Sequence, residues 1–244
     1  MTVLETCRTR LVVGDGAMGT ELQRAGLPIG EPGERWVLEH PDRLQAIHEA
    51  YLAAGSEAII TGTFGANRWV LGRYGLEDKV EAINREAARV ARRAAGRATV
   101  LGDIGPFGGF LQPLGDVAVD DLQAEFTRQA RALLDGGADG IIVETVTAIE
   151  EMGAALRAAR AAGAPFVIAS FAFDHTASGA IRTMMGVSPE QAAKAAVADG
   201  ASALGANCGT NMAVADFTRV VAAFRSVADL PVVIAALRNA HPYE

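Results

Sequence analysis

The amino-acid sequence predicts an α/β protein of the (β/α)₈ TIM-type parallel barrel class, truncated after its seventh strand. Two observations support this class. Short apolar runs alternate with longer stretches of helical spacing along the 244 residues, and polar residues stand repeatedly where an apolar run ends. Strands that alternate with helices imply right-handed crossovers and therefore a parallel sheet.

Seven apolar runs predict the strands. They are almost continuously apolar and do not alternate with polar residues, which is typical of strands that are buried on both faces. The runs are "LVVGDG" (11–16), "EAIITG" (57–62), "TVLGDI" (99–104), "GIIVET" (140–145), "FVIASF" (166–171), "ALGANC" (203–208) and "PVVIAA" (231–236).

The stretches between these runs predict helices. They are rich in Ala, Leu and Arg at helical spacing, as in "KVEAINREAARVARRAAG" (79–96). Most of them end in glycine, which adopts the left-handed backbone conformation after a helix and lets the chain turn into the next strand. These glycines are Gly55, Gly96, Gly137, Gly163 and Gly200.

A doubly wound sheet is the alternative architecture. It would place a G-x-G-x-x-G turn after its first strand, but the turn here reads "GDGAMGTELQ" (14–23), without that spacing. A TIM-type barrel instead places functional residues at the carboxyl ends of many strands. Five polar residues stand at such ends and favour the barrel: Asp15, Thr61, Asp103, Glu144 and Cys208.

The number of strands is one short of a closed barrel, because the sequence stops directly after the seventh run. An open barrel exposes the edges of its first and last strands, where another chain can pair. We therefore expect either a homo-oligomer or another partner that covers this edge, or a longer protein from which strand eight is missing.

Composition narrows the function classes. The formal net charge of -7 disfavours a nucleic-acid partner, since phosphate binding depends on a basic face. No apolar run approaches the roughly 18–20 residues that span a bilayer, and the first ten residues lack the apolar stretch of a signal peptide. The two cysteines, Cys7 and Cys208, cannot form a disulfide framework. We expect a cytoplasmic protein without a membrane or nucleic-acid partner.

Asp15 and Glu144 are the first candidates for chemistry, because a carboxylate at the end of an apolar strand needs a reason to be there. Either acid alone could cap a helix or form a structural ion pair. Two acids at one barrel mouth could instead bind a substrate ammonium group. The backbone N–H groups of "GAMGT" (16–20) could then hold a carboxylate, as a nest of successive amides does. Together these groups would recognise an amino acid.

Cys208 is the second candidate. It is either a small buried apolar residue or a zinc thiolate, and zinc sites need about four ligands. No C-x-x-C or Cys-Cys pair accompanies it, and Cys7 precedes the first strand, at the far end of a barrel. A Schiff-base enzyme is disfavoured, because Lys79 and Lys194 are the only lysines and both lie in helical stretches.

Seven segments, taken in order, carry a family resemblance. They are "DGAMGTELQ" (15–23), "TGTFGAN" (61–67), "GLEDKV" (75–80), "GDIGP" (102–106), "PLGD" (113–116), "IIVET" (141–145) and "GANCG" (205–209). The chain resembles the homocysteine S-methyltransferase family, which includes the homocysteine-binding module of cobalamin-dependent methionine synthase and the betaine-dependent enzymes. The resemblance implies that residues 1–244 form a single homocysteine-binding barrel domain that lacks strand eight and its Cys-Cys motif.

The resemblance also implies a site and a reaction. Asp15 and Glu144 match the acids that bind the homocysteine amino group, and Asn207 precedes the cysteine of the family's G-x-N-C motif. Cys208 matches the first of three zinc-binding cysteines and is thus the expected metal ligand and catalytic residue. Zinc would activate the homocysteine thiol to accept a methyl group and give methionine. The backbone of Gly16, Ala17, Gly19 and Thr20 matches the carboxylate site.

Two departures qualify this expectation. The first is that the family's Gly-Gly-Cys-Cys-Gly motif is absent, and "RNAHP" (238–242) is the remnant of the segment that leads to it. The second is that Gly62 stands where the family usually has Asn. Nothing in the sequence binds a methyl donor, so a small-molecule donor or methylcobalamin on another module or protein would supply the methyl group. A non-catalytic remnant that binds an amino acid or a protein partner is the alternative. An enzyme that uses Asp15 and Glu144 as an acid/base pair ranks last.

Overall fold

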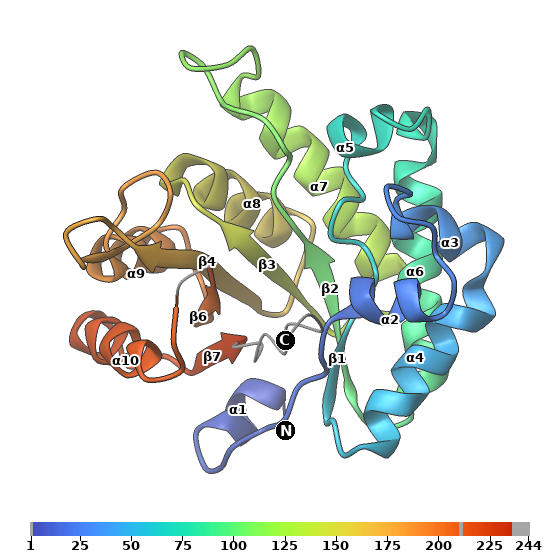
Figure 1. Ribbon diagram of the computed structural model, residues 1–244, viewed down its shortest axis with the longest axis horizontal. Helices are drawn as coiled ribbons and strands as arrows, with labels where there is room; N and C mark the ends of the chain where they lie inside the picture. Colours follow the sequence, from blue (N-terminus) through green and yellow to red (C-terminus); the bar gives the residue numbers. More distant parts are fainter. Residues whose placement is uncertain (1, 210–211, 236–244) are drawn as a thin grey trace.

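The architecture is an open, curled parallel sheet with its helices on the outside. The structure, a computed structural model, describes residues 2–209 and 212–235. Six parallel strands pair in the order β1-β2-β3-β4-β6-β7, and Figure 1 shows them curling around one axis. The strands are β1 (Ala58–Ile60), β2 (Thr99–Ile104), β3 (Gly140–Val146), β4 (Val167–His175), β6 (Ala203–Cys208) and β7 (Val232–Ala235), and the short β5 (Ile181–Arg182) pairs antiparallel with the end of β4.

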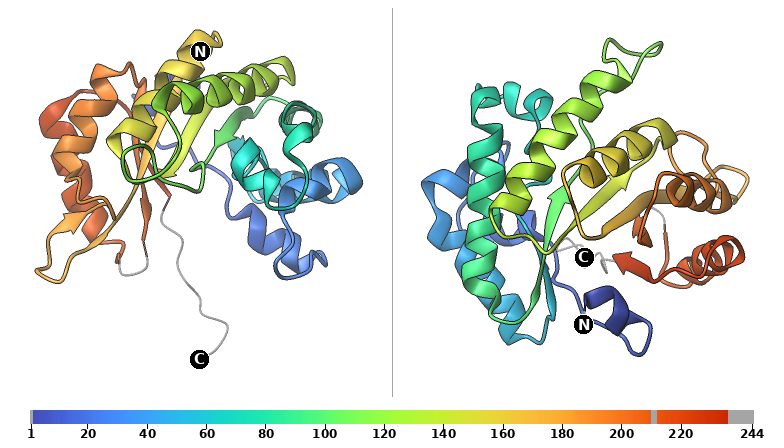
Figure 2. Two further views of the ribbon diagram at one scale, coloured as in Figure 1. Left: turned by 90° about the horizontal axis from the view of Figure 1, so that it is seen from above. Right: turned by 180° about the vertical axis from the view of Figure 1, so that it is seen from behind.

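The long helices follow the strands and cover the convex face of the sheet, which both views of Figure 2 show clearly. The predicted glycine stops have the expected left-handed backbone, for example Gly137 (φ 105°) and Gly163 (φ 91°). The helices are α1 (Val3–Cys7), α2 (Met18–Arg24), α3 (Gly33–Glu39), α4 (Pro41–Ala53), α5 (Arg68–Gly72), the 3₁₀ turn η1 (Glu77–Lys79), α6 (Val80–Ala95), α7 (Val119–Asp135), α8 (Ile149–Ala161), α9 (Pro189–Ala198) and α10 (Asp216–Val227).

The strands are apolar on both faces because each face has its own core. In β3, Ile141 and Val143 are buried with the helices on the convex side, whereas Ile142 belongs to a separate cluster inside the curl. Val3 and Leu4 of α1 pack against that inner cluster. The short helix α1 therefore closes the end of the curl that lies opposite the carboxyl ends of the strands (Figure 1).

The predicted fold class is confirmed, with a correction for the first run. Six of the seven predicted runs form strands of the sheet, but "LVVGDG" (11–16) makes only an isolated bridge from Gly14 to Ala58, beside a hydrogen bond from Glu57 N–H to the Val13 carbonyl (2.8 Å). Within the described residues no strand pairs with its other side, and Leu11 is 91% exposed. The segment 238–242 and the end of the seventh run lie outside the described residues. No helix in the described part of the chain is long and apolar enough to cross a membrane.

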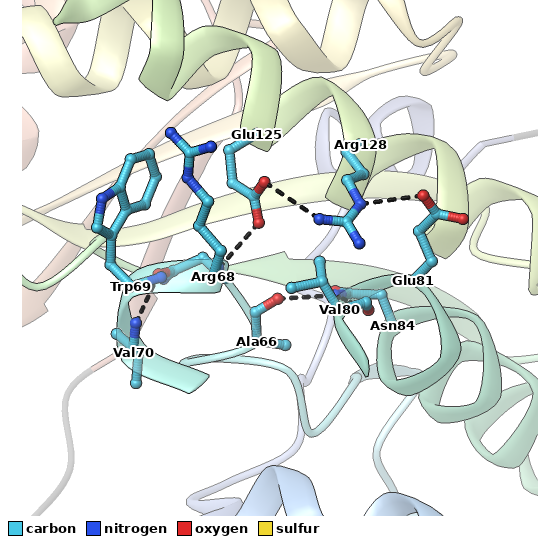
Figure 3. A network of polar contacts seen from close by, with 10 residues as sticks. Ala66, Arg68, Trp69, Val70, Val80, Glu81, Asn84, Glu125 and Arg128 are labelled. Carbon is cyan, nitrogen blue, oxygen red and sulfur yellow. Dashed lines mark hydrogen bonds and ion pairs between the residues drawn. The ribbon is translucent and has the colours of Figure 1, made fainter. Parts of the chain in front are cut away.

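A polar network fixes the loop that follows β1, as Figure 3 shows. The buried carboxylate of Glu125 in α7 accepts the Arg68 N–H (2.9 Å) at the start of α5 and lies 3.6 Å from the guanidinium of Arg128. The side chain of Asn84 in α6 donates to the Ala66 carbonyl (2.8 Å). Helices α6 and α7 thus hold the segment that leads out of β1, at the end of the sheet where the strand-end polar residues gather.

Candidate active site at the carboxyl ends of the strands

Three carboxyl groups gather at the carboxyl end of the sheet. Asp15 follows the bridge at Gly14, Asp103 lies near the end of β2, and Glu144 lies in the second half of β3. The three are close enough that the charge of Glu144 raises the pKa of both Asp15 and Asp103. Asp15 and Glu144, both expected at the mouth of the barrel, thus interact through their charges, and Asp103 joins them. Their role in binding a substrate stays a prediction.

Asp15 carries a carboxyl group with one satisfied and one unsatisfied oxygen. Its Oδ2 accepts the Ile60 N–H (2.8 Å), whereas the buried Oδ1 has no hydrogen-bond partner among the described residues. Burial raises the pKa of Asp15 to about 7, and the charge of Glu144 adds to this, although backbone N–H groups lower it. A cation at this point would satisfy Oδ1 and favour the ionised form.

Asp103 is the most deeply buried of the three acids, with a side chain that is 2% exposed. Its N–H donates to the Thr61 hydroxyl (2.9 Å), and its carbonyl accepts from the Thr63 hydroxyl (2.8 Å). The two hydroxyls also bond to each other (2.7 Å). The ends of β1 and β2 are thus locked together, which fixes the main chain that carries Asp103. Burial first, and then the neighbouring Glu144, raise the pKa of Asp103 well above its ordinary value.

Glu144 is held by a strained turn. Thr145 has a left-handed backbone (φ 63°), which costs of order 1–3 kcal/mol for a residue other than glycine. Its hydroxyl donates to Glu144 Oε2 (3.2 Å). The Asn207 side chain from β6 accepts the Thr145 N–H (3.3 Å), donates to the Thr145 hydroxyl (3.1 Å) and accepts from the Ser170 hydroxyl (3.1 Å). Asn207 therefore holds the turn that aims Glu144.

The segment 16–20, whose backbone N–H groups are expected to hold a carboxylate, combines a tightly packed glycine with the start of a helix. Gly16 is required by packing, because a Cβ there would lie 2.8 Å from the hydroxyl of Tyr51, which itself donates to the Ala17 carbonyl (3.2 Å). Helix α2 begins at Met18 without a side-chain cap. The first N–H groups of a helix have no acceptor within it, and for α2 these belong to Met18, Gly19 and Thr20.

Cys208 ends β6, where its main chain pairs with Phe173 of β4. Its side chain lies outside the described part of the structure. Among the described residues no group of three or more His, Cys, Asp or Glu side chains is arranged to hold a metal ion. Cys7 is a free cysteine in α1, at the opposite end of the curl. The expectation that Cys208 is a zinc ligand therefore stays a prediction.

A cavity of about 650 Å³ opens beside the acids, between the loops that follow β2 and β3 and the loop after β5. Thr145 lines it, so it adjoins the site of Glu144. Its lining is mainly apolar, and burial raises the pKa of the Glu151 carboxyl in this wall to about 7. Met184 and Met185 line this cavity and are 77% and 39% exposed.

Sequence reasoning missed part of this arrangement. Asp103 was visible as a strand-end acid in "GDIGP", but no role was assigned to it. Nothing in the sequence marked Glu34, whose carboxylate is buried and accepts the Gly65 N–H (2.6 Å), with a pKa raised by burial. The left-handed Thr145 carried no signal either, because a threonine gives no indication of positive φ.

The curled parallel sheet and the acids at its carboxyl end define the class of TIM-barrel-type proteins, whose sites lie at that end. Comparison with known sequences then identifies the family: the model for homocysteine S-methyltransferase matches residues 12–243, and the chain belongs to that family. Methionine synthase of Mycobacterium leprae is 36% identical over 225 residues, and that of Mycobacterium tuberculosis is 35% identical over 229. Each match covers 86% of this chain but only 19% of the relative's length.

Solved structures support the fold. The homocysteine methyltransferase MmuM from Escherichia coli in its metallated form superimposes with a TM-score of 0.78 and 24% identity, over 95% of this chain and 85% of that one. Its apo form gives a TM-score of 0.73 at 23% identity, over 97% of this chain and 85% of that one. At this identity the likeness concerns the backbone fold, so the roles of individual residues must be argued from this chain.

The strained turn yields a prediction about stability. Thr145→Gly and Thr145→Ala both remove the hydroxyl that bonds Glu144 and Asn207, but only glycine adopts φ 63° without strain. Thr145→Gly should therefore be more stable than Thr145→Ala by about 1 kcal/mol, as measured by urea unfolding. If the alanine variant were equally or more stable, the left-handed turn would not be a source of strain.

Proposed function

We propose that residues 1–244 form a single homocysteine-binding domain that acts as the methyl acceptor module of an S-methyltransferase. The observation that carries this proposal is the cluster of buried carboxyl groups at the carboxyl end of the sheet, of which Asp15 and Asp103 each have an unpartnered oxygen. Buried acids without a cation are costly, and the ammonium group of an amino acid supplies both the charge and the hydrogen-bond donors.

The ammonium and carboxylate groups of homocysteine would bind to different parts of the site. Asp15 and Glu144 receive the ammonium group, and the N–H groups around Gly16, Ala17, Gly19 and Thr20 receive the carboxylate. Asn207 takes part through the turn at Thr145 that positions Glu144. The homocysteine side chain would then extend toward the end of β6, where Cys208 stands.

The reaction is an alkylation of sulfur. A free thiol has a pKa near 8.5 and is mostly protonated at neutral pH. After the thiol has lost its proton, its sulfur forms a bond to the methyl carbon while the bond between the donor and that carbon breaks, which gives methionine. The methyl donor, whether a small molecule or methylcobalamin on another module or protein, would reach the sulfur from the open end of the curl, beside the apolar cavity.

Zinc, which the family implies as the activator of the thiol, does not fit residues 1–244 as a complete site. Zinc needs about four ligands, whereas the sequence holds two cysteines and Cys7 lies in α1. We propose that Cys208 is the one zinc ligand that this chain supplies, and that the other thiolates come from outside these residues. The open edge at Leu11 and β7 is where an added strand from a second copy, a partner or further chain would pair.

The alternative is a non-catalytic remnant that binds an amino acid or a protein partner. The small number of cysteines favours it. The enzyme and the remnant are both expected to bind the amino acid, so binding alone does not distinguish them. Metal content and methyl transfer distinguish the two.

The first test concerns ligand binding. Glu144→Gln keeps the shape of the side chain but removes its charge, and a charged hydrogen bond is worth about 1.5–3 kcal/mol. Calorimetry should therefore show homocysteine binding weakened by roughly 10- to 100-fold relative to wild type. Glu49→Gln, at an exposed position of α4, is the matched control and should leave binding unchanged. Equal affinity of wild type and Glu144→Gln would refute the assignment of Glu144.

The second test concerns zinc and turnover. The 244-residue protein should hold well below one zinc per chain. The zinc content of Cys208→Ser should equal that of wild type. A fusion that adds a Gly-Gly-Cys-Cys-Gly strand after residue 244 should gain both zinc and homocysteine-dependent methyl transfer, and both gains should vanish with Cys208→Ser. A fusion that binds homocysteine but transfers no methyl group from methylcobalamin, betaine or S-methylmethionine would leave the remnant as the explanation.

A further inference from the structure

Asp103 is a buried acid that the proposed binding scheme does not use. Burial raises the pKa of its carboxyl most, and the charges of Glu144 on β3, Glu34 on α3 and Asp15 on the segment before α2 raise it further. No arginine, lysine or histidine in the described residues forms an ion pair with it. A fully buried carboxylate in acidic surroundings cannot remain ionised without a compensating group.

Asp103 and Glu144 differ in their hydrogen bonds, and this difference indicates which of the two carboxyl groups keeps a proton. Burial raises the pKa of Glu144, but the hydrogen bond that its Oε2 accepts from the Thr145 hydroxyl (3.2 Å) opposes this rise and favours the ionised form. Asp103 of β2 pairs in register with Ile142 of β3, so the side chains of Asp103 and Glu144 lie on the same face of neighbouring strands. The Oδ1 of Asp103 has no hydrogen-bond partner among the described residues. When two carboxyl groups share a site, one of them keeps a proton. The acid without other donors is the one that keeps it, which is Asp103.

We propose that Asp103 is a positioning residue: it stays protonated and donates a hydrogen bond to the Glu144 carboxylate, so that the pair acts as one oriented anion toward the substrate ammonium group. This inference rests on the proposed function and deepens it. The locked main chain of Asp103, bonded to Thr61 and Thr63, fixes the donor, while the Thr145 hydroxyl holds Glu144 from the other side. The pair therefore contributes one negative charge instead of two.

Two substitutions of nearly equal size separate this role from a charge or packing role. Asp103→Asn keeps a hydrogen-bond donor without a titratable proton, so homocysteine affinity should stay within about threefold of wild type. Asp103→Leu removes the donor, so affinity should fall by about tenfold or more. Because Glu144 then loses a bond that lowers its pKa, the midpoint of binding against pH should move upward in the leucine variant alone.

The outcomes of the calorimetry are decisive in both directions. Rescue by asparagine together with an upward pH shift in Asp103→Leu supports the positioning role. Equal loss in both variants would mean that Asp103 acts through its own negative charge, and the proposal would be wrong. A leucine variant that loses stability but keeps the affinity and pH profile of wild type would show a packing role and would also overturn it.

A ligand-free measurement keeps this inference separate from the proposed function. In protein with ¹³C-labelled aspartate carboxyl carbons, one aspartate should remain protonated at about pH 8, above the pKa of about 7 of Asp15. Its signal should disappear in Asp103→Asn, whereas the control Asp120→Asn in α7 should leave it in place. Absence of a protonated aspartate overturns the inference. A protonated Asp103 in a protein that binds no homocysteine overturns the proposed function, and the positioning role with it, while the proton assignment stands.

Discussion

Negative charge buried without a matching cation is the constraint on which this site depends. Asp15, Asp103 and Glu144 meet at one end of a parallel sheet, and burial is the largest cause of the raised pKa of each. Folding alone would favour apolar residues at these positions, because buried acids reduce stability unless they are paired or protonated. In the proposed function, a ligand that brings positive charge makes the arrangement favourable, and the cost to the free protein becomes a source of affinity for that ligand.

The rest of the fold keeps these acids in place. The parallel sheet brings the ends of distant strands together, and the hydroxyls of Thr61 and Thr63 tie β1 to Asp103 of β2. Asn207 of β6 stabilises the left-handed turn at Thr145, directly after Glu144. Binding sites built on packed strands hold their side chains more precisely than sites on loops. Here the supporting hydrogen bonds join the end of β1 to β2, and β3 to β6.

Much of this could be predicted from sequence, for identifiable reasons. A run such as "GIIVET" is apolar on both faces because helices cover one side of β3 and the inner cluster covers the other, and that pattern is local. The association of Asp15 with Glu144 followed from strand ends and from the family resemblance. The position of Asp103 on the same face as Glu144, the burial of Glu34 and the positive φ of Thr145 were not predictable, because they arise from contacts between segments far apart in the chain. The first run makes a single bridge to β1, at Gly14, and no local sequence pattern reports how many residues of a run pair with a neighbouring strand.

The most direct test of the central claim is the unfolding free energy of Asp15→Asn and wild type, without ligand, between about pH 5 and pH 8. The folded-state pKa of Asp15, about 7, lies above its ordinary value of 3.8, so the stability tied to its proton is present at low pH and lost as the pH rises through about 7. Asp15→Asn should therefore gain stability relative to wild type as the pH rises, and adding homocysteine should reverse the order by stabilising wild type alone. A difference between the two proteins that does not change with pH, or equal stabilisation of both by homocysteine, would contradict the account.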